Sequence, residues 1–183
     1  MKIKNLLSAV LFLFFVSYFA QNTIEVMSFN IRLGSVDDGE NHWNIRKDKV
    51  KDLINYYEAD FVGLQEAQKP QINYLLENNS LYSFLGKPRD DGENSEFSCI
   101  FYLKNKYKVL EQNTFWLSET PEKSTKSWDA AYPRIVTYAL FENIKTKKKV
   151  WVFNTHFDHV GMVARQKSAE IILKKMKELQ RKK

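Results

Sequence analysis

The feature that most constrains the fold is a series of short apolar runs separated by polar turns. Strand-like runs occupy residues 23–31, 60–64, 81–85, 97–103, 107–110, 114–117, 134–141 and 150–154. Helical periodicity occupies residues 43–58, 70–76 and 162–180. The order is strand, helix, strand, helix, then several strands, then a helix. Because the strands are rich in Phe, Tyr, Val and Ile, we predict an α/β fold of packed sheets with helices outside.

The two longer helices are predicted to bury an apolar stripe each. In residues 43–58 the stripe consists of Trp43, Val50, Leu53, Ile54 and Tyr57. In residues 162–180 it consists of Ala169, Ile172, Leu173, Met176 and Leu179. Pro70 opens the shorter helix, as proline does at a first helical turn.

Residues 1–20 have the layout of a secretory signal peptide. Lys2 and Lys4 precede an apolar stretch over residues 6–19, which is short for a membrane span. Ala20 suits the last position before cleavage, but Tyr18 stands where a small residue is usual. An uncleaved N-terminal anchor is the alternative. We expect export to a periplasm or the medium, no other membrane span, and one domain over residues 21–183.

Charge and cysteine content limit the partners and the compartment. The chain has 28 Lys and Arg against 22 Asp and Glu, a formal net charge of +6. This excess permits a polyanionic partner without requiring one. A single cysteine, Cys99, excludes an intrachain disulfide, so an exported chain must be held by packing. No stable protein partner is implied.

Three polar residues end or follow apolar runs: Asn30, Glu66 and His156. A layered fold places its functional site at the ends of strands, because side chains in the middle of a strand pack in the hydrophobic core. A carboxylate and an amide oxygen suit Mg²⁺, and an imidazole can bind a phosphoryl oxygen or move a proton. Each residue also has an alternative without a functional role. Asn30 can be a turn residue, Glu66 a solvated loop charge, and His156 a half-buried histidine with its hydrogen bonds satisfied.

Longer motifs around these residues resemble a known family. SFNIR (28–32), GENHWNIRK (39–47), DFVGLQE (60–66), NTFWLSETP (113–121), SWDAAYPR (127–134), PRIVTYA (133–139) and NTHFDHVG (154–161) appear in this order. Together they resemble the endonuclease/exonuclease/phosphatase superfamily of metal-dependent phosphoesterases, especially its exported bacterial members. The resemblance covers nearly the whole of residues 21–183.

The resemblance implies a four-layer α/β/β/α sandwich of the DNase I-like type and assigns roles to the three residues. Glu66 matches the family's ligand for a divalent cation, usually Mg²⁺ and sometimes Mn²⁺. Asn30 matches an asparagine beside the metal that supports the attacking water or the phosphate, so it is a candidate both for catalysis and, with Glu66, for the metal site. His156 matches the histidine that hydrogen-bonds the scissile phosphate.

Three further residues are candidate substrate contacts by the same resemblance. Arg134 resembles an arginine aimed at the phosphate; the alternative is a surface arginine that begins a strand. Tyr102 lies where family members present a phenol, or else it is a core aromatic. Asp158 follows His156 by two residues, which on a strand returns to the same face, so it can orient His156 or substrate. A turn aspartate is the alternative.

Two family motifs, GDFN and SDH, do not occur in the sequence. The chain therefore resembles the N-terminal part of a family member, truncated at its C-terminus, and we expect it to be inactive or nearly so by itself. The leading function is hydrolysis of a phosphate ester. The sequence does not distinguish between nucleic acid, a phospholipid head group and a sugar phosphate as the substrate. The alternative is a non-catalytic module that binds phosphorylated or lipid head-group ligands on the same scaffold.

Overall fold

The computed structural model describes residues 23–181 and contains two β-sheets. The first has the order β1-β2-β4-β3, formed by Val26–Asn30, Phe61–Gln65, Ile100–Leu103 and Tyr82–Leu85. The second has the order β5-β6-β7, formed by Tyr107–Trp116, Ile135–Asn143 and Lys149–Thr155. Strands β1 and β2 run parallel, and the other paired strands run antiparallel.

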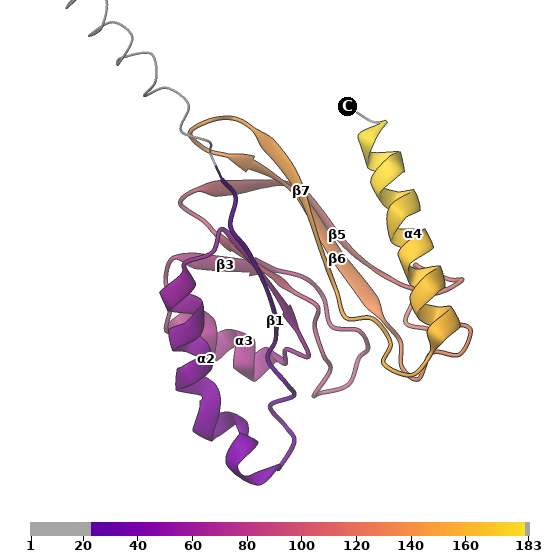
Figure 1. The fold of residues 1–183 in the computed structure, drawn as a ribbon, viewed down its shortest axis with the longest axis horizontal. Coiled ribbons are helices and arrows are strands. Elements are labelled where there is room, and N and C mark those ends of the chain that lie inside the picture. Colours follow the sequence, from indigo (N-terminus) through magenta and orange to yellow (C-terminus); the bar gives the residue numbers. More distant parts are fainter. Residues whose placement is uncertain (1–22, 182–183) are drawn as a thin grey trace, which may run out of the picture.

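The helices cover the outer faces of the two sheets (Figure 1). Helix α2 (Trp43–Tyr57) and helix α3 (Lys69–Glu77) pack on the first sheet, and helix α4 (Met162–Gln180) packs on the second. A short 3-10 helix, η1 (Gly39–Asn41), precedes α2. The layers are therefore helix, sheet, sheet and helix, and the predicted α/β/β/α sandwich is confirmed.

The facing sides of the two sheets share an aromatic core. Phe61 of β2 lies with its ring centre 4.7 Å from that of Phe141 in β6 and 4.6 Å from that of Tyr107 in β5. All three side chains are buried. Fully burying an aromatic or aliphatic side chain stabilises a fold by about 1.5–3 kcal/mol, so this contact holds the sheets face to face.

Strand β5 differs from the sequence prediction, which had two strands separated by polar residues. The structure has one strand over residues 107–116, with a register shift between Val109 and Glu111. β5 lies at the edge of its sheet, and the polar residues Glu111, Gln112 and Asn113 are exposed while their backbone still pairs with β6. A bulge of this kind adds a residue without ending the strand.

The buried stripes of the long helices are narrower than predicted. Trp43, Val50 and Ile54 are buried in α2, but Leu53 and Tyr57 are 41% and 56% exposed. In α4, Ile172 and Leu179 are buried, and Leu173 is 56% exposed. The predicted signal peptide, residues 1–20, lies outside the described residues and stays a prediction. Within residues 23–181, no helix combines the length and the apolar character that a membrane crossing requires.

Candidate active site

The candidate site lies where the ends of β1, β2 and β7 meet. Asn30 is the last residue of β1, Glu66 directly follows β2, and His156 directly follows β7. Because β1 and β2 are parallel, with Asn30 opposite Gln65, the side chains beyond their carboxyl ends come together. The structure thus brings together the three residues that the sequence singled out.

The carboxylate of Glu66 is held by two donors from the end of β1 and the loop that follows. Its Oε1 accepts a hydrogen bond from Nδ2 of Asn30 at 2.8 Å, and its Oε2 accepts one from the backbone N–H of Leu33 at 3.2 Å. Glu66 has a φ of 57°, a left-handed conformation that costs a non-glycine residue about 1–3 kcal/mol. This turn aims the carboxylate away from the core.

Asn154 fixes β7 against β2 and thereby places His156. Its Nδ2 donates to the backbone carbonyls of Leu64 and Cys99, both at 2.8 Å, and its Oδ1 accepts from Nε2 of Gln65 at 2.7 Å. Gly63 makes room for this side chain, since a Cβ there would lie 2.7 Å from Oδ1 of Asn154. With β7 held in this way, Nε2 of His156 lies 4.0 Å from Oε1 of Glu66.

Asp158 holds the buried guanidinium of Arg134, which directly precedes β6. Oδ2 of Asp158 accepts from Nε of Arg134 at 3.1 Å. The carboxylate also accepts from the backbone N–H groups of Ala131, Tyr132, Val160 and Gly161. Burial by itself raises the pKa of Asp158, but these backbone donors and Arg134 together hold the pKa far below its ordinary value of 3.8.

The predicted contact between Asp158 and His156 is replaced by this contact with Arg134. Strand β7 ends at Thr155, so the rule that alternate residues share a face does not extend to Asp158. The carboxylate of Asp158 accepts from Arg134 and from four backbone N–H groups, and the side chain is buried. Its place in the structure is that of a residue that orients Arg134.

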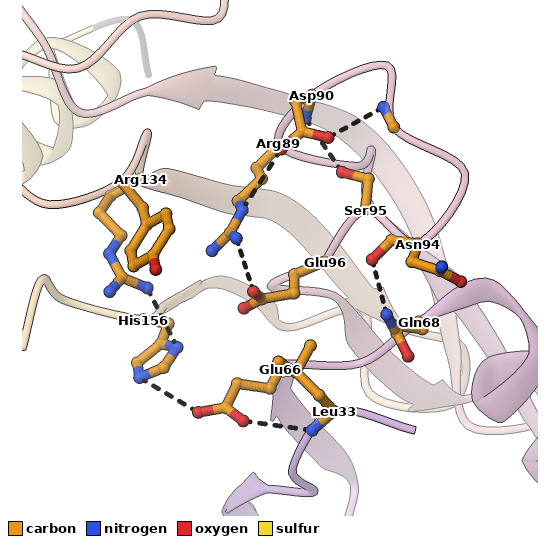
Figure 2. A network of polar contacts seen from close by, with 12 residues as sticks. Leu33, Glu66, Gln68, Arg89, Asp90, Asn94, Ser95, Glu96, Arg134 and His156 are labelled. Atoms are coloured by element: carbon orange, nitrogen blue, oxygen red, sulfur yellow. Dashed lines mark hydrogen bonds and ion pairs between the residues drawn. The ribbon is translucent and has the colours of Figure 1, made fainter. Parts of the chain in front are cut away.

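The surroundings of His156 favour its neutral form. Burial lowers its pKa below the ordinary 6.5, Arg134 lowers it further, and Glu66 opposes the shift. Nδ1 of His156 lies 3.4 Å from Nη1 of Arg134, which can only donate. The ring proton therefore belongs on Nε2, the nitrogen that faces Glu66. Figure 2 shows the imidazole of His156 between the carboxylate of Glu66 and the guanidinium of Arg134.

Tyr102 does not join this cluster. Its ring centre lies 5.0 Å from that of Phe141, between the two sheets. It pairs with Phe61 at the beginning of β2, whereas Glu66 follows the end of that strand. Tyr102 and Ile100 share the face of β4 that packs on the second sheet. The structure thus assigns Tyr102 to the core, in place of the substrate contact that the resemblance implied.

Arg89, Glu96 and His159 belong to the cluster, and sequence reasoning gave none of them a role. Nη2 of Arg89 lies 2.7 Å from Oε1 of Glu96, in the connection between β3 and β4. Nδ1 of His159 lies 3.1 Å from Nη2 of Arg134. Figure 2 shows the Arg89–Glu96 pair facing the side occupied by Glu66 and His156. The sequence signal was the charged GKPRDDGE segment directly after a predicted strand.

The donor set fits a hard cation held by few protein ligands. Each oxygen of Glu66 accepts one hydrogen bond and so retains a lone pair. Asn30 turns Nδ2 to Glu66 and Oδ1 to the backbone N–H of Arg32 at 2.9 Å, so it supports the carboxylate. Within residues 23–181, no group of three or more His, Cys, Asp or Glu side chains is placed to hold a metal ion. Mg²⁺ tolerates one or two carboxylates with water completing its shell.

Comparisons with known proteins agree with this fold. A solved endonuclease/exonuclease/phosphatase from Bacteroides vulgatus is 43% identical, with a TM-score of 0.81, over 85% of this chain and 60% of that one. A mannosyl-6-phosphatase from Bacteroides thetaiotaomicron is 36% identical, with a TM-score of 0.81, over 87% of this chain and 61% of that one. An uncharacterized protein of Acanthamoeba polyphaga mimivirus is 29% identical over 124 residues, 63% of this chain and 46% of that protein.

No protein-family model matches the sequence. The chain spans about 60% of the length of the two bacterial structures and 46% of the viral protein. Over that span, both bacterial structures share the fold of this chain with a TM-score of 0.81, and they are 43% and 36% identical to it in sequence. The chain belongs to the endonuclease/exonuclease/phosphatase superfamily.

Proposed function

We propose that the cluster of Glu66, His156 and Arg134 is the site of a metal-dependent phosphoesterase that hydrolyses its substrate by attack of water on phosphorus. One observation carries this proposal: a carboxylate from the first sheet and a histidine from the second lie 4.0 Å apart, with a buried arginine beside the histidine. Phosphate ester hydrolysis needs positive charge and hydrogen-bond donors on the phosphoryl oxygens, and this arrangement supplies both.

Each residue has a separate part in the proposed reaction. Glu66 would hold Mg²⁺, or Mn²⁺ in its place, with Asn30 keeping the carboxylate in position. A bound Mg²⁺ supplies positive charge to the phosphoryl oxygens and to the attacking water. His156 donates its Nε2–H to a phosphoryl oxygen. Arg134 adds a fixed positive charge whose direction Asp158 sets.

The substrate class that we propose first is a sugar phosphate. The relative from Bacteroides thetaiotaomicron is a mannosyl-6-phosphatase, which supports that choice. Nucleic acid and phospholipid head groups stay as alternatives, and the modest net charge of +6 does not favour nucleic acid. Export by residues 1–20, to a periplasm or the medium, is part of the same proposal.

We further propose that the 183-residue chain is nearly inactive without other residues. The described site offers one carboxylate to the cation, and Mg²⁺ held by one carboxylate binds loosely. Groups that act as a catalytic unit lose orders of magnitude in rate when one is missing. The same observation favours the second candidate function, a non-catalytic module that binds phosphorylated ligands.

Turnover and binding separate these functions. We expect the purified chain to hydrolyse p-nitrophenyl phosphate slowly with Mg²⁺ and to stop with EDTA. Glu66→Gln and His156→Ala should each lower the rate at least about tenfold. Glu77→Gln, which removes an exposed carboxylate of α3, is the matched control. Turnover that survives EDTA and both variants contradicts the proposal. Phosphate binding that His156→Ala abolishes, without any turnover, favours the binding module.

A further inference from the structure

We propose that Arg89 is a second phosphate-binding arginine and that it makes this site selective for phosphate monoesters over diesters. The inference rests on the proposed function, because it concerns the same site. Arg89 lies outside the motifs that carry the superfamily resemblance, and its proposed role determines the ionic form of the substrate that the site prefers.

The backbone around Arg89 is built into the fold. Its carbonyl oxygen accepts from Nε1 of Trp116 and from Oγ of Ser124, both at 2.7 Å. Its N–H donates to the carbonyl of Glu96 at 2.9 Å. Trp116 ends β5 of the second sheet, whereas Arg89 belongs to a connection of the first sheet. Both sheets therefore fix Arg89, unlike an arginine on a free surface loop.

The same connection is tied to the residue that follows Glu66. The N–H of Phe97 donates to the carbonyl of Ala67 at 2.7 Å, and Phe97 also bridges to Pro88. Ala67 directly follows Glu66. The Arg89–Glu96 pair is thus held in register with the carboxylate that would bind the cation.

The side chain of Arg89 lies on the side of the site where Arg134 and His156 lie. Its Cζ is 5.0 Å from the centre of the Tyr132 ring, and the Cζ of Arg134 is 5.8 Å from the same centre. The two guanidinium groups therefore share one aromatic ring. Figure 2 shows Arg89, Arg134 and His156 directed toward a common region above Glu66.

Two arginines suit a terminal phosphate better than a diester. A phosphate monoester has a second pKa of about 6 and carries close to two negative charges at neutral pH, on three terminal oxygens. A diester carries one charge, and an organic group replaces one of those oxygens. Since guanidinium–phosphate contacts are charge-assisted and often bidentate, the second arginine gains a partner only in the monoester.

Binding of methyl phosphate and dimethyl phosphate at pH 8 with Mg²⁺, measured by calorimetry, tests the inference. Arg89→Met should weaken methyl phosphate binding about tenfold, because a charged hydrogen bond contributes about 1.5–3 kcal/mol. Dimethyl phosphate binding should change less than about twofold, since it lacks the third terminal oxygen that we assign to Arg89. Lys87→Met, which removes an exposed charge of the same connection, should change neither.

A second variant, Glu96→Gln, tests whether Arg89→Met acts only by disturbing the structure. Glu96→Gln keeps the shape of the partner of Arg89 and removes its negative charge. Glu96→Gln should strengthen methyl phosphate binding, because it frees Arg89 from its ion pair. If Arg89 only stabilised the connection between β3 and β4, the affinity for methyl phosphate would not change. An unchanged ratio of the two affinities in both Arg89→Met and Glu96→Gln overturns the inference.

Arg134→Met distinguishes this failure from failure of the proposed function. Arg134 should contact either ligand, so its replacement should weaken both methyl phosphate and dimethyl phosphate. If Arg134→Met weakens both ligands but Arg89→Met spares methyl phosphate, only the role of Arg89 is wrong. If Arg134→Met and His156→Ala change neither ligand, the site itself is wrong and the role of Arg89 is wrong with it.

Discussion

At the scale of single residues, the charged groups of the site are oriented by buried partners. Asp158 is 2% exposed, and its carboxylate accepts from Arg134 and from four backbone N–H groups. The loop of Ala131 and Tyr132, the loop after β7 and the guanidinium therefore converge on one carboxylate. The carboxylate of Asp158 therefore stabilises the fold and orients the guanidinium of Arg134.

Replacing Asp158 should cost stability. Asp158→Asn removes one partner of a buried charge pair, so the free energy of unfolding should fall by about 3–5 kcal/mol. Because the pKa of Asp158 is lowered on folding, its stabilisation is complete above the ordinary pKa of 3.8 and is lost as pH falls through the lower folded value. Urea unfolding at pH 7 measures the loss.

Asp129→Asn is the matched control for that experiment. Asp129 also accepts from backbone N–H groups, those of Val163 and Ala164 at the beginning of α4, but it is exposed. Its replacement should be clearly milder. Equal losses for the two variants would contradict the account of Asp158.

Single residues also show what the sequence could and could not predict about the site. Asn30, Glu66 and His156 were singled out because each ends or follows an apolar run, and the motifs around them, which resemble the superfamily, assigned their roles. Arg89 and Glu96 were missed because they reach the site through a connection whose path depends on tertiary contacts with Trp116 and Ala67. The spacing of apolar residues in the sequence does not indicate such contacts.

At the scale of elements, the site depends on the register between β2 and β7. These strands belong to different sheets, and Asn154 joins them by side-chain hydrogen bonds to Leu64, Gln65 and Cys99. Gly63 provides the space. His156 follows Asn154 by two residues, so a shift here would move the imidazole relative to Glu66.

A double-mutant cycle tests this contact. Gly63→Ala should lower the free energy of unfolding by about 1–3 kcal/mol, because the added methyl group overpacks against Asn154. In the Asn154→Ala background, where that side chain is absent, the same change should cost markedly less. Urea unfolding of the four proteins gives the coupling. Strictly additive losses would show that Gly63 and Asn154 do not meet as described.

Element boundaries followed the sequence where apolar periodicity was continuous. Helix α4 occupies Met162–Gln180 as predicted, since a long amphipathic pattern fixes both type and extent. Strand β5 was divided wrongly because the consecutive polar residues Glu111, Gln112 and Asn113 interrupt the apolar pattern, although their backbone still pairs with β6. The sequence does not say which strand will lie at an edge.

At the scale of the whole molecule, each sheet supplies part of the site. The first sheet brings Asn30, Glu66 and the connection with Arg89, and the second brings Arg134 and His156. The aromatic core between Phe61 and Phe141 holds the two parts together. The order of elements predicted packed sheets with helices outside, and the family resemblance added the four layers. The meeting of these side chains depends on the packing of both sheets, which neither of them describes.

The most direct test of the account is whether His156 responds to a phosphate ester. The chain has three histidines, so a long-range proton–nitrogen NMR spectrum resolves each imidazole. His42, whose Nδ1 accepts from the backbone N–H of Asn44 at the beginning of α2, serves as an internal control. We predict that methyl phosphate with Mg²⁺ shifts Nε2 of His156 in a saturable way, leaves His42 unchanged, and has no such effect in Arg134→Met. A His156 signal that moves no more than that of His42 would contradict the assignment of this cluster as a phosphate-ester site.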